Sequence, residues 1–296
     1  MSIELDQYFK ARRELIEKSL DQFLPSEQTY PEKIHQAIRY SLFGGGKRIR
    51  PILLLAGYEI FRDDLERAMP FACALEMIHN YSLIHDDLPA MDDDDFRRGK
   101  PTCHKMFGEA TAILAGDALL TEAFGLMARA GLEMGSDQVG LKAIQELGQA
   151  AGLSGIITGQ ELDLEKQGQV YNEQDLEYIS RHKTAALIRA SVKVGGILGG
   201  AGESELTALS EFGERIGRAF QIVDDVLDFQ VGDRDRKGSE SDARKKKATY
   251  PALLGLSQSR ELAKRLSREA LKCLEIFSDR AEPLRKIAGW LVAREY

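Results

Sequence analysis

Two clusters of aspartates, each within or just after an apolar stretch, constrain the fold of this chain more than any other feature. They consist of Asp86, Asp87 and Asp92 in the first cluster and Asp224, Asp225 and Asp228 in the second. Two unit charges 4 Å apart repel by roughly 4 kcal/mol at an effective dielectric constant near 20. A fold keeps such clusters when a cation shares them or when they face water. Because Mg²⁺ combines one or two carboxylates with water and substrate phosphates, the clusters predict a diphosphate held between metal-bearing walls.

The spacing within each cluster predicts its local structure. The second cluster has the i, i+3, i+4, i+7 spacing of one helix face, with Gln221, Asp224, Asp225 and Asp228. In the first cluster Pro89 disfavours helical geometry at Leu88, so Asp92 must approach Asp86 through a turn or bulge. The alternative is that acidic runs are solvated helix faces or loops. That explanation suits residues 93–95, but it fits the second cluster poorly because apolar residues bracket it.

Apolar residues recur with helical periodicity along nearly the whole chain, and the alternation typical of strands is almost absent. The expected helices cover residues 5–23, 31–40, a segment starting at 50–51, 70–87, 111–130, 138–161, 172–198, 203–229, 249–277 and 283–296. The most polar stretch, residues 232–247, is expected to be a mobile loop. We therefore expect one all-α domain, residues 1–296. It would be a helical bundle whose central helices carry both aspartate clusters inward around an active-site cavity.

Composition excludes several classes of function. Of the 296 residues 43% are apolar, which is enough for a substantial core, and the net charge of −7 makes a nucleic-acid partner unexpected. The three cysteines are odd in number and widely spaced, so they form no disulfide framework and indicate a reducing cytoplasm. The chain contains no run of 18 apolar residues, so no membrane-spanning helix is expected. Its first residues do not resemble a signal peptide.

Basic residues next to a run of glycines predict a binding site for a diphosphate. The segment GGGKRIRP at 44–51 places a flexible turn before Lys47, Arg48 and Arg50, so that backbone N–H groups and bidentate guanidinium groups could bind phosphate. Its spacing is not that of a P-loop. Arg97 and Arg98 follow the first acidic cluster, where charge balance is an alternative role for one of them.

No nucleophile with an adjacent base is apparent, so the chemistry is expected to rely on metal ions that activate a leaving group. Lys183-Thr184 lies in the middle of an expected helix and could be a mere surface pair. We interpret His85 as structural. The pair Cys103-His104 could indicate a soft metal site, but it has no second pair, and we interpret it as a buried thiol beside a packed histidine.

These motifs together resemble the trans-isoprenyl diphosphate synthases, most closely the bacterial farnesyl diphosphate synthases, over nearly the whole chain. The matching segments are GGGKRIRP at 44–51, MIHNYSLIHDDLPAMDDDDFRRGKPTCH at 77–104, GQELDL at 159–164, HKTAALIRA at 182–190, FQIVDDVLD at 220–228 and ATYPALLGL at 248–256. The resemblance implies the isoprenoid synthase fold and condensation of isopentenyl diphosphate with an allylic diphosphate.

The resemblance also implies roles for individual residues. Three Mg²⁺ ions would be held, two by Asp86 and Asp92 with support from Asp87, and a third by Asp224 with help from Asp225 and Asp228. The allylic diphosphate would be gripped by Arg97, Lys183 and the loop lysines Lys237 and Lys247. Isopentenyl diphosphate would bind Lys47, Arg50, His79 and Arg98. Thr184 and Gln221 would stabilise the allylic cation. The loop lysines depart from the family pattern, because Arg236-Lys237-Gly238 and Lys246-Lys247-Ala248 replace the usual Gly-Lys pairs.

Product length and assembly are further expectations. Tyr81 lies about one helical turn before Asp86 and should block chain growth, whereas Ser82 leaves room, so farnesyl diphosphate is expected and geranylgeranyl diphosphate is the alternative. The family usually forms homodimers. A terpene cyclase would lack the GGGKRIRP segment. A non-catalytic partner subunit would lose metal-binding aspartates, all of which are present here.

Overall fold

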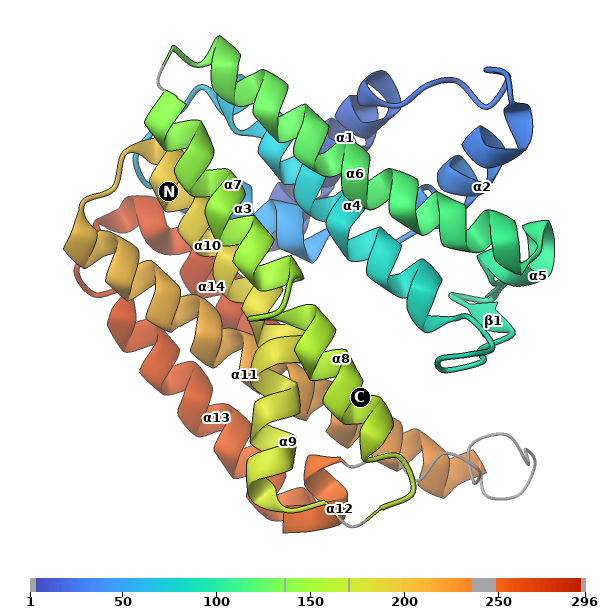
Figure 1. Ribbon diagram of the computed structural model, residues 1–296. Coiled ribbons are helices and arrows are strands. Elements are labelled where there is room, and N and C mark those ends of the chain that lie inside the picture. Colours follow the sequence, from blue (N-terminus) through green and yellow to red (C-terminus); the bar gives the residue numbers. More distant parts are fainter. Residues whose placement is uncertain (1–3, 136, 170, 236–248, 294–296) are drawn as a thin grey trace. The chain divides into compact units, whose positions relative to one another are not determined.

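The computed structural model describes residues 4–135, 137–169, 171–235 and 249–293, and within them the chain is all-α, as predicted (Figure 1). The helices are α1 Leu5–Phe23, α2 Glu32–Leu42, α3 Ile49–Glu59, α4 Met69–Asp86, α5 Cys103–Phe107, α6 Glu109–Glu133, α7 Asp137–Ala151, α8 Ile156–Glu165, α9 Glu173–Ile179, α10 Ala186–Gly199, α11 Glu203–Asp235, α12 Tyr250–Leu254, α13 Leu256–Cys273 and α14 Glu282–Val292. Short 3₁₀ turns cover Leu65–Arg67 and Asp279–Ala281. A two-residue hairpin pairs β1 Phe96–Arg97 with β2 Lys100–Pro101 in antiparallel register.

Three of the expected long helices are interrupted. The helix expected over 138–161 breaks before α8 at Gly155, where a Cβ atom would lie 1.9 Å from the carbonyl oxygen of Ala150. The helix expected over 249–277 breaks at Gly255, whose φ of +79° favours glycine. The helix expected over 172–198 is interrupted by a π-helical segment, Ser180–Ala185, which separates α9 from α10.

The expected loop over 232–247 is wrong at its beginning. Helix α11 continues to Asp235, beyond the expected end at 229, so residues 232–235 are helical. Gly232 is therefore tolerated inside the helix rather than ending it. The remainder of that segment, 236–248, lies outside the described residues.

The contacts divide the chain into two compact units. The first comprises Met1–Leu55 with Arg62–Gln145, and the second comprises Ala56–Phe61 with Glu146–Tyr296. Each unit has its own buried apolar side chains.

Helix α4 lies in the core of the first unit and packs most extensively against α6. Phe71, Leu75 and Met77 of α4 have no exposed surface. Near the end of α4, His85 approaches Gly116 of α6 so closely that a Cβ atom there would lie 2.1 Å from His85 Nε2. Because this helix is enclosed to its last turn, core packing fixes the position at which the first aspartate cluster begins.

Helix α6 also has an exposed apolar face, and it is long and apolar enough to cross a membrane by length and composition alone. A core helix of a soluble protein passes the same test, so this is weak evidence for a membrane span. The exposed residues are Ile113, Leu114 and Leu132, which are 44%, 58% and 73% exposed.

Helix α11 organises the second unit and packs against α10, α13 and the π-helical segment. Gly213 and Gly217 let the backbones meet, because Cβ atoms there would lie 2.6 Å from Arg189 Cα and 2.7 Å from Ala185 Cα. This close approach brings the face of α11 with the second aspartate cluster next to the π-helical segment.

A buried ion pair connects the start of α3 to α4 in the first unit. Arg48 donates to Glu76 Oε1 at 2.8 Å, and the two side chains are 1% and 2% exposed. Arg48 also donates to the Leu42 carbonyl at 2.7 Å, and Asn80 donates to Glu76 Oε1 at 3.2 Å. These contacts fix the segment that carries the glycine turn and its neighbouring cations.

We expect Glu76→Gln to lower the free energy of unfolding by about 3 kcal/mol, because it removes the buried counter-charge of Arg48 and leaves only the more exposed Glu17 carboxylate, 3.6 Å from Arg48 Nε. The matched control is Glu122→Gln, which removes the partner of Arg129 on the exposed side of α6 and should change stability by about 1 kcal/mol at most. Urea unfolding of both variants measures the difference. Equal losses would show that the Arg48–Glu76 pair is no more important than a surface pair.

Candidate active site

The first aspartate cluster is shaped by a turn directly after α4. Asp92 N–H donates to the Asp86 carbonyl at 2.8 Å, and Met91 N–H donates to the Leu88 carbonyl at 2.9 Å. The predicted turn that returns Asp92 to Asp86 is therefore confirmed. Asp92 is 6% exposed and Asp86 is half-buried, so two carboxylate-bearing residues are brought together at the end of an apolar helix.

Asp87, the middle member of this cluster, is paired inside the protein. Arg97 Nε donates to its two carboxylate oxygens at 2.7 and 3.0 Å. Burial raises the pKa of Asp87, although the hydrogen bond and charge of Arg97 oppose this shift. Burial also acts against the charge of Arg97, but its contacts with Asp87 outweigh burial and raise its pKa. Asp87 thus orients Arg97 beside the cluster.

The glycine turn and its cations form a second group in the first unit. Arg50 NH1 contacts His79 Nε2 at 3.1 Å, and Arg98 donates to the Gly45 carbonyl. Burial, together with the charge of Arg50, lowers the pKa of His79 well below its usual value. A neutral His79 accepts the hydrogen bond from Arg50, while Lys47 is exposed. The structure thus brings Arg50 next to His79 and Arg98 next to the glycine turn.

The second aspartate cluster lies on one face of α11, as its spacing predicted. Asp225 is buried and accepts at both oxygens, from Gln221 Nε2 at 2.7 Å and from Tyr250 N–H at 3.1 Å. Burial raises the pKa of Asp225 to about 7 despite these hydrogen bonds. Asp224 is half-buried and Asp228 is exposed. Asp225 therefore fixes Gln221 and the start of α12, whereas its two neighbours are more accessible to a ligand.

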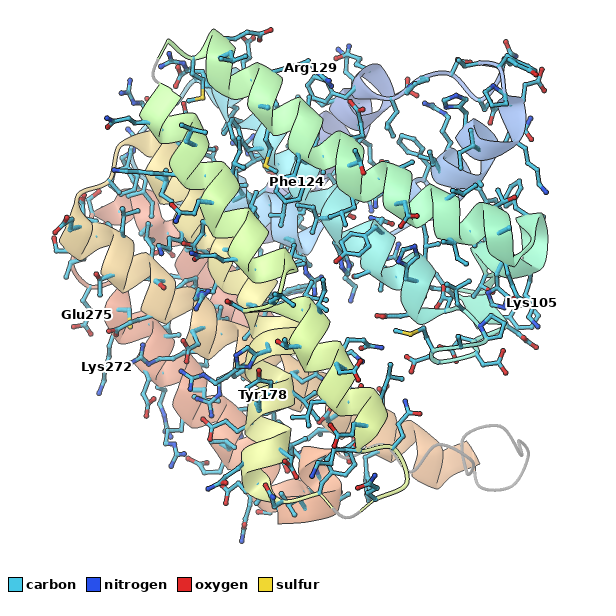
Figure 2. The ribbon with its side chains drawn as sticks, viewed as in Figure 1. Lys105, Phe124, Arg129, Tyr178, Lys272 and Glu275 are labelled. Carbon is cyan, nitrogen blue, oxygen red and sulfur yellow. The ribbon has the colours of Figure 1, made fainter. Side chains whose placement is uncertain are left out.

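Lys183 and Thr184 lie in the π-helical segment rather than in the middle of a regular helix. Such insertions into helices are frequent at functional sites. Thr184 Oγ1 donates to Gln221 Oε1 at 2.5 Å, and Lys183 Nζ donates to Asp163 Oδ2 at 2.5 Å. The segment is also braced by Tyr178 (Figure 2), whose ring stacks on His182 with centroids 3.8 Å apart. Three predicted site residues of the second unit are thus close together.

Residues of α8 complete this group, and the sequence reasoning did not assign them a role. Asp163, the partner of Lys183, belongs to the GQELDL segment. Gln160, one turn earlier, is 6% exposed, and within the described residues neither polar atom of its side chain makes a hydrogen bond. At Gly159 a Cβ atom would lie 2.3 Å from Lys183 N, so α8 packs directly on the π-helical segment. In the sequence, the position of Asp163 between Leu162 and Leu164 was the signal that could have indicated this role.

Tyr81 and Ser82 lie in the last turns of α4. Tyr81 is 6% exposed and its ring meets His85 edge-on, with centroids 5.8 Å apart. Burial and then the charge of Asp86 raise the pKa of Tyr81 to about 12, so it carries its hydroxyl proton at neutral pH. Ser82 donates to the His79 carbonyl at 2.9 Å. Two further predicted site residues, Lys237 and Lys247, lie outside the described residues.

Comparison with known proteins identifies the family. Residues 31–281 match the polyprenyl synthetase family. A farnesyl diphosphate synthase of Geobacillus stearothermophilus is 46% identical over 261 residues, which cover 88% of this chain and 87% of that protein. The large subunit 1 of a chloroplastic heterodimeric geranylgeranyl pyrophosphate synthase of Arabidopsis thaliana is 45% identical over 303 residues, covering 99% of this chain and 80% of that protein.

A solved structure agrees with these sequence matches. The apo structure of an FPP/GFPP synthase from Zymomonas mobilis superimposes with a TM-score of 0.88 at 36% identity, covering 99% of this chain and 100% of that one. The resemblance drawn from the motifs is confirmed. The chain belongs to the polyprenyl synthetase family and has its all-α fold.

Proposed function

We propose that this chain condenses isopentenyl diphosphate head-to-tail with dimethylallyl diphosphate, then with geranyl diphosphate, to give farnesyl diphosphate and pyrophosphate. The observation that carries this proposal is the arrangement in the first unit. There, the turn that joins Asp92 to Asp86 is followed directly by Arg97 and Arg98. Metal-binding oxygens and phosphate-binding cations lie within a few residues of each other, which suits a substrate that is itself a metal diphosphate.

The donor set fits Mg²⁺. A buried Asp92 beside Asp86 supplies hard oxygen ligands, and water and substrate phosphates can complete the shell. We propose three Mg²⁺ ions, two held by Asp86 and Asp92 and a third held by Asp224 with Asp228 beside it. Asp87 and Asp225 would support them by orienting Arg97 and Gln221. When bound, Mg²⁺ would neutralise the charge of the departing diphosphate and so favour cleavage of the allylic C–O bond.

The cations of both units would bind the same allylic diphosphate. Arg97 and Lys183 are held by Asp87 and Asp163, and each can share or exchange that partner for phosphate. Lys237 and Lys247 are proposed to add to this group. We propose that residues 1–296 form one catalytic domain.

The hydroxyl and amide oxygens near α11 would stabilise the carbocation. Cleavage of the allylic C–O bond gives an allylic cation and pyrophosphate, and the double bond of isopentenyl diphosphate attacks that cation. The resulting tertiary cation loses a proton to the departing pyrophosphate and forms the new double bond. Thr184 donates its hydroxyl hydrogen to Gln221, so its lone pairs remain to face positive charge.

We expect Asp86→Ala and Asp224→Ala each to lower turnover about 100-fold or more, comparable to the loss of one group that stabilises developing negative charge. The assay follows labelled isopentenyl diphosphate into longer products with an allylic primer and Mg²⁺. Asp6→Ala, an exposed aspartate in α1, is the control and should keep full activity. A variant of either cluster with an unchanged helical spectrum and near-normal activity would contradict the metal role.

Two separate diphosphate pockets are proposed, and Lys47, Arg50, His79 and Arg98 would bind isopentenyl diphosphate. Lys47→Ala should therefore raise KM for isopentenyl diphosphate more than KM for the allylic substrate. The physical reason is that this exposed cation lies beside the glycine turn, outside the aspartate cluster. Steady-state kinetics with each substrate varied in turn makes the comparison, and equal effects on both KM values would argue for a single shared pocket.

Farnesyl diphosphate, C15, is the proposed main product, and geranylgeranyl diphosphate, C20, is the second candidate. The relatives include synthases named for each product. Buried Tyr81 favours the shorter chain, because it lies one turn before Asp86 and a helical turn rises about 5.4 Å, close to one isoprene unit.

We expect Tyr81→Ala to shift the product distribution from C15 toward C20, because it removes the side chain proposed to form the floor of the pocket. Ser82→Ala, which changes the side-chain volume little at the neighbouring position, should leave C15 as the main product. Chromatographic sizing of dephosphorylated products measures both. A Tyr81→Ala variant that still stops at C15 with undiminished activity would place the floor elsewhere.

A homodimer is the proposed assembly. The apolar face of α6 with Ile113, Leu114 and Leu132, and the neighbouring Leu141, which is 62% exposed, support this proposal. One relative is named as a subunit of a heterodimer, so a non-catalytic partner role is the alternative, but both metal motifs are intact here. Sedimentation should give twice the chain mass at micromolar concentration and should revert to the monomer mass in Leu114→Glu. A wild-type monomer would refute the proposal.

The proposed location is the cytoplasm. Cys73, Cys103 and Cys273 form no disulfide in the structure, in keeping with a reducing compartment. Titration of natively prepared, denatured protein should find three reactive thiols, and fewer would point to an oxidising compartment.

A further inference from the structure

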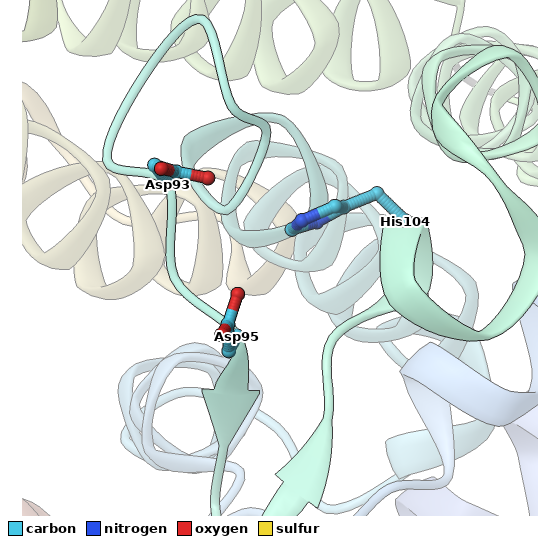
Figure 3. Close-up of side chains that lie close together, drawn as sticks. All are labelled: Asp93, Asp95 and His104. Carbon is cyan, nitrogen blue, oxygen red and sulfur yellow. The ribbon is translucent and has the colours of Figure 1, made fainter.

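Three side chains outside the proposed catalytic metal sites converge between the first aspartate cluster and α5 (Figure 3). They are Asp93, Asp95 and His104, called here the loop cluster. One ligand atom from each lies within 4.8 Å of the other two. Both aspartates are exposed, while His104 is 6% exposed. Exposed carboxylates are common on protein surfaces without a metal ion, so the buried histidine is the feature that distinguishes this cluster.

The backbone holds these residues in fixed positions. Asp93 has a φ of +50°, and its N–H donates to the Leu88 carbonyl at 3.1 Å. The carbonyl of Asp95 accepts from Thr102 N–H at 3.0 Å, which joins the two ends of the β1–β2 hairpin. Backbone hydrogen bonds therefore fix the positions from which the side chains of the loop cluster extend.

The hydrogen bonds of Thr102 determine which nitrogen of His104 carries hydrogen. The Thr102 hydroxyl has one hydrogen, and it donates to the Asp94 carbonyl at 2.8 Å. Its contact with His104 Nδ1 at 3.1 Å must then be one in which Nδ1–H donates to the hydroxyl oxygen. In the neutral ring, Nε2 consequently carries the lone pair.

The unsatisfied Nε2 of His104 points to a cation. This atom is buried and makes no hydrogen bond within the part of the chain that the structure describes. A buried ring nitrogen without a hydrogen bond, on a histidine that lies beside two carboxylates, is unfavourable unless a positive charge lies among them. Fixing of one ring nitrogen by a hydrogen bond so that the other can bind metal is the usual arrangement at metal-binding histidines. The packed histidine expected from the sequence is indeed buried, but packing leaves Nε2 unexplained.

We propose that Asp93, Asp95 and His104 bind one divalent transition-metal ion, of the class of Co²⁺, Mn²⁺ or Zn²⁺. An imidazole with two carboxylates is a mixed nitrogen and oxygen donor set that suits these ions, whereas Mg²⁺ is bound by oxygen ligands. Lys105 Nζ lies 2.7 Å from Asp95 Oδ1. That exposed pair contributes about 1 kcal/mol at most, so it does not prevent binding.

The bound ion would join the two ends of the hairpin that carries Arg97. Asp93 and Asp95 precede β1 and His104 follows β2, so the metal closes this segment as a cross-link. The inference stands on the loop cluster alone and does not need the proposed reaction.

The test is binding of Co²⁺ to the full-length protein after removal of metals by a chelator. The titration is performed without substrate and in excess Mg²⁺, which occupies the all-oxygen sites. Visible absorption of Co²⁺ reports nitrogen and oxygen coordination and gives a dissociation constant. We expect one such site in the wild type. Asp93→Asn, Asp95→Asn and His104→Ala should each raise its dissociation constant by about 10-fold or more, the smallest effect expected when even an outer hydrogen-bonding partner of a metal ligand is lost.

Two variants serve as controls. Asp94→Asn, between the two ligating aspartates, and Asp86→Ala, in the proposed catalytic site, should both retain the cobalt site. Loss of the cobalt site in Asp86→Ala would assign the ion to the aspartate cluster and overturn the proposal. If His104→Ala does not fold, as judged by circular dichroism, the two exposed asparagine variants decide the question.

Two other results would also overturn the proposal. Absence of a cobalt spectrum in the wild type would mean that the loop cluster binds no such ion. A cobalt site unaffected by Asp93→Asn and Asp95→Asn would mean that the ion binds elsewhere.

Discussion

Repulsion between closely spaced carboxylates is the constraint on which the rest of this structure depends. Each unit carries an aspartate cluster at a helix that its core requires, and each unit satisfies one of the carboxylates with internal hydrogen-bond donors. In the first unit Arg97 binds both oxygens of Asp87. In the second, Gln221 and Tyr250 N–H satisfy both oxygens of Asp225. The remaining carboxylates of each cluster still repel one another, and a divalent cation would reduce that repulsion.

The same internal pairing separates structural charges from those presented to a ligand. Of the three cations in the GGGKRIRP segment, Arg48 is enclosed and paired with Glu76, whereas Lys47 is exposed. Burial of a charge is tolerated only with a partner, so the buried pair fixes the loop and leaves the flanking cations at its surface. Lys183 follows a related principle, because Asp163 holds its ammonium group in a defined place.

Sequence periodicity correctly predicted the all-α class and the helix face that carries the second aspartate cluster, because both follow from the spacing of residues along the chain. It did not predict the breaks at Gly155 and Gly255, since a glycine can also lie inside a helix, as Gly232 does in α11. It also missed the π-helical segment at Lys183, against which α8 packs closely at Gly159. Pro89 did reveal the turn to Asp92, because proline restricts the backbone locally. Partners distant along the chain, such as Glu76 for Arg48 and Asp163 for Lys183, require a fold before they can be assigned.

The proposed function requires that both aspartate clusters act on one diphosphate through metal ions. Calorimetric binding of an uncleavable allylic diphosphate analogue, with and without Mg²⁺, tests it most directly in the wild type, Asp86→Asn and Asp224→Asn. We predict that tight binding requires Mg²⁺ and that either variant weakens it by about 10-fold or more, a difference of about 1.4 kcal/mol. Binding that does not depend on Mg²⁺, or that survives unchanged in one of the two variants, would contradict the account.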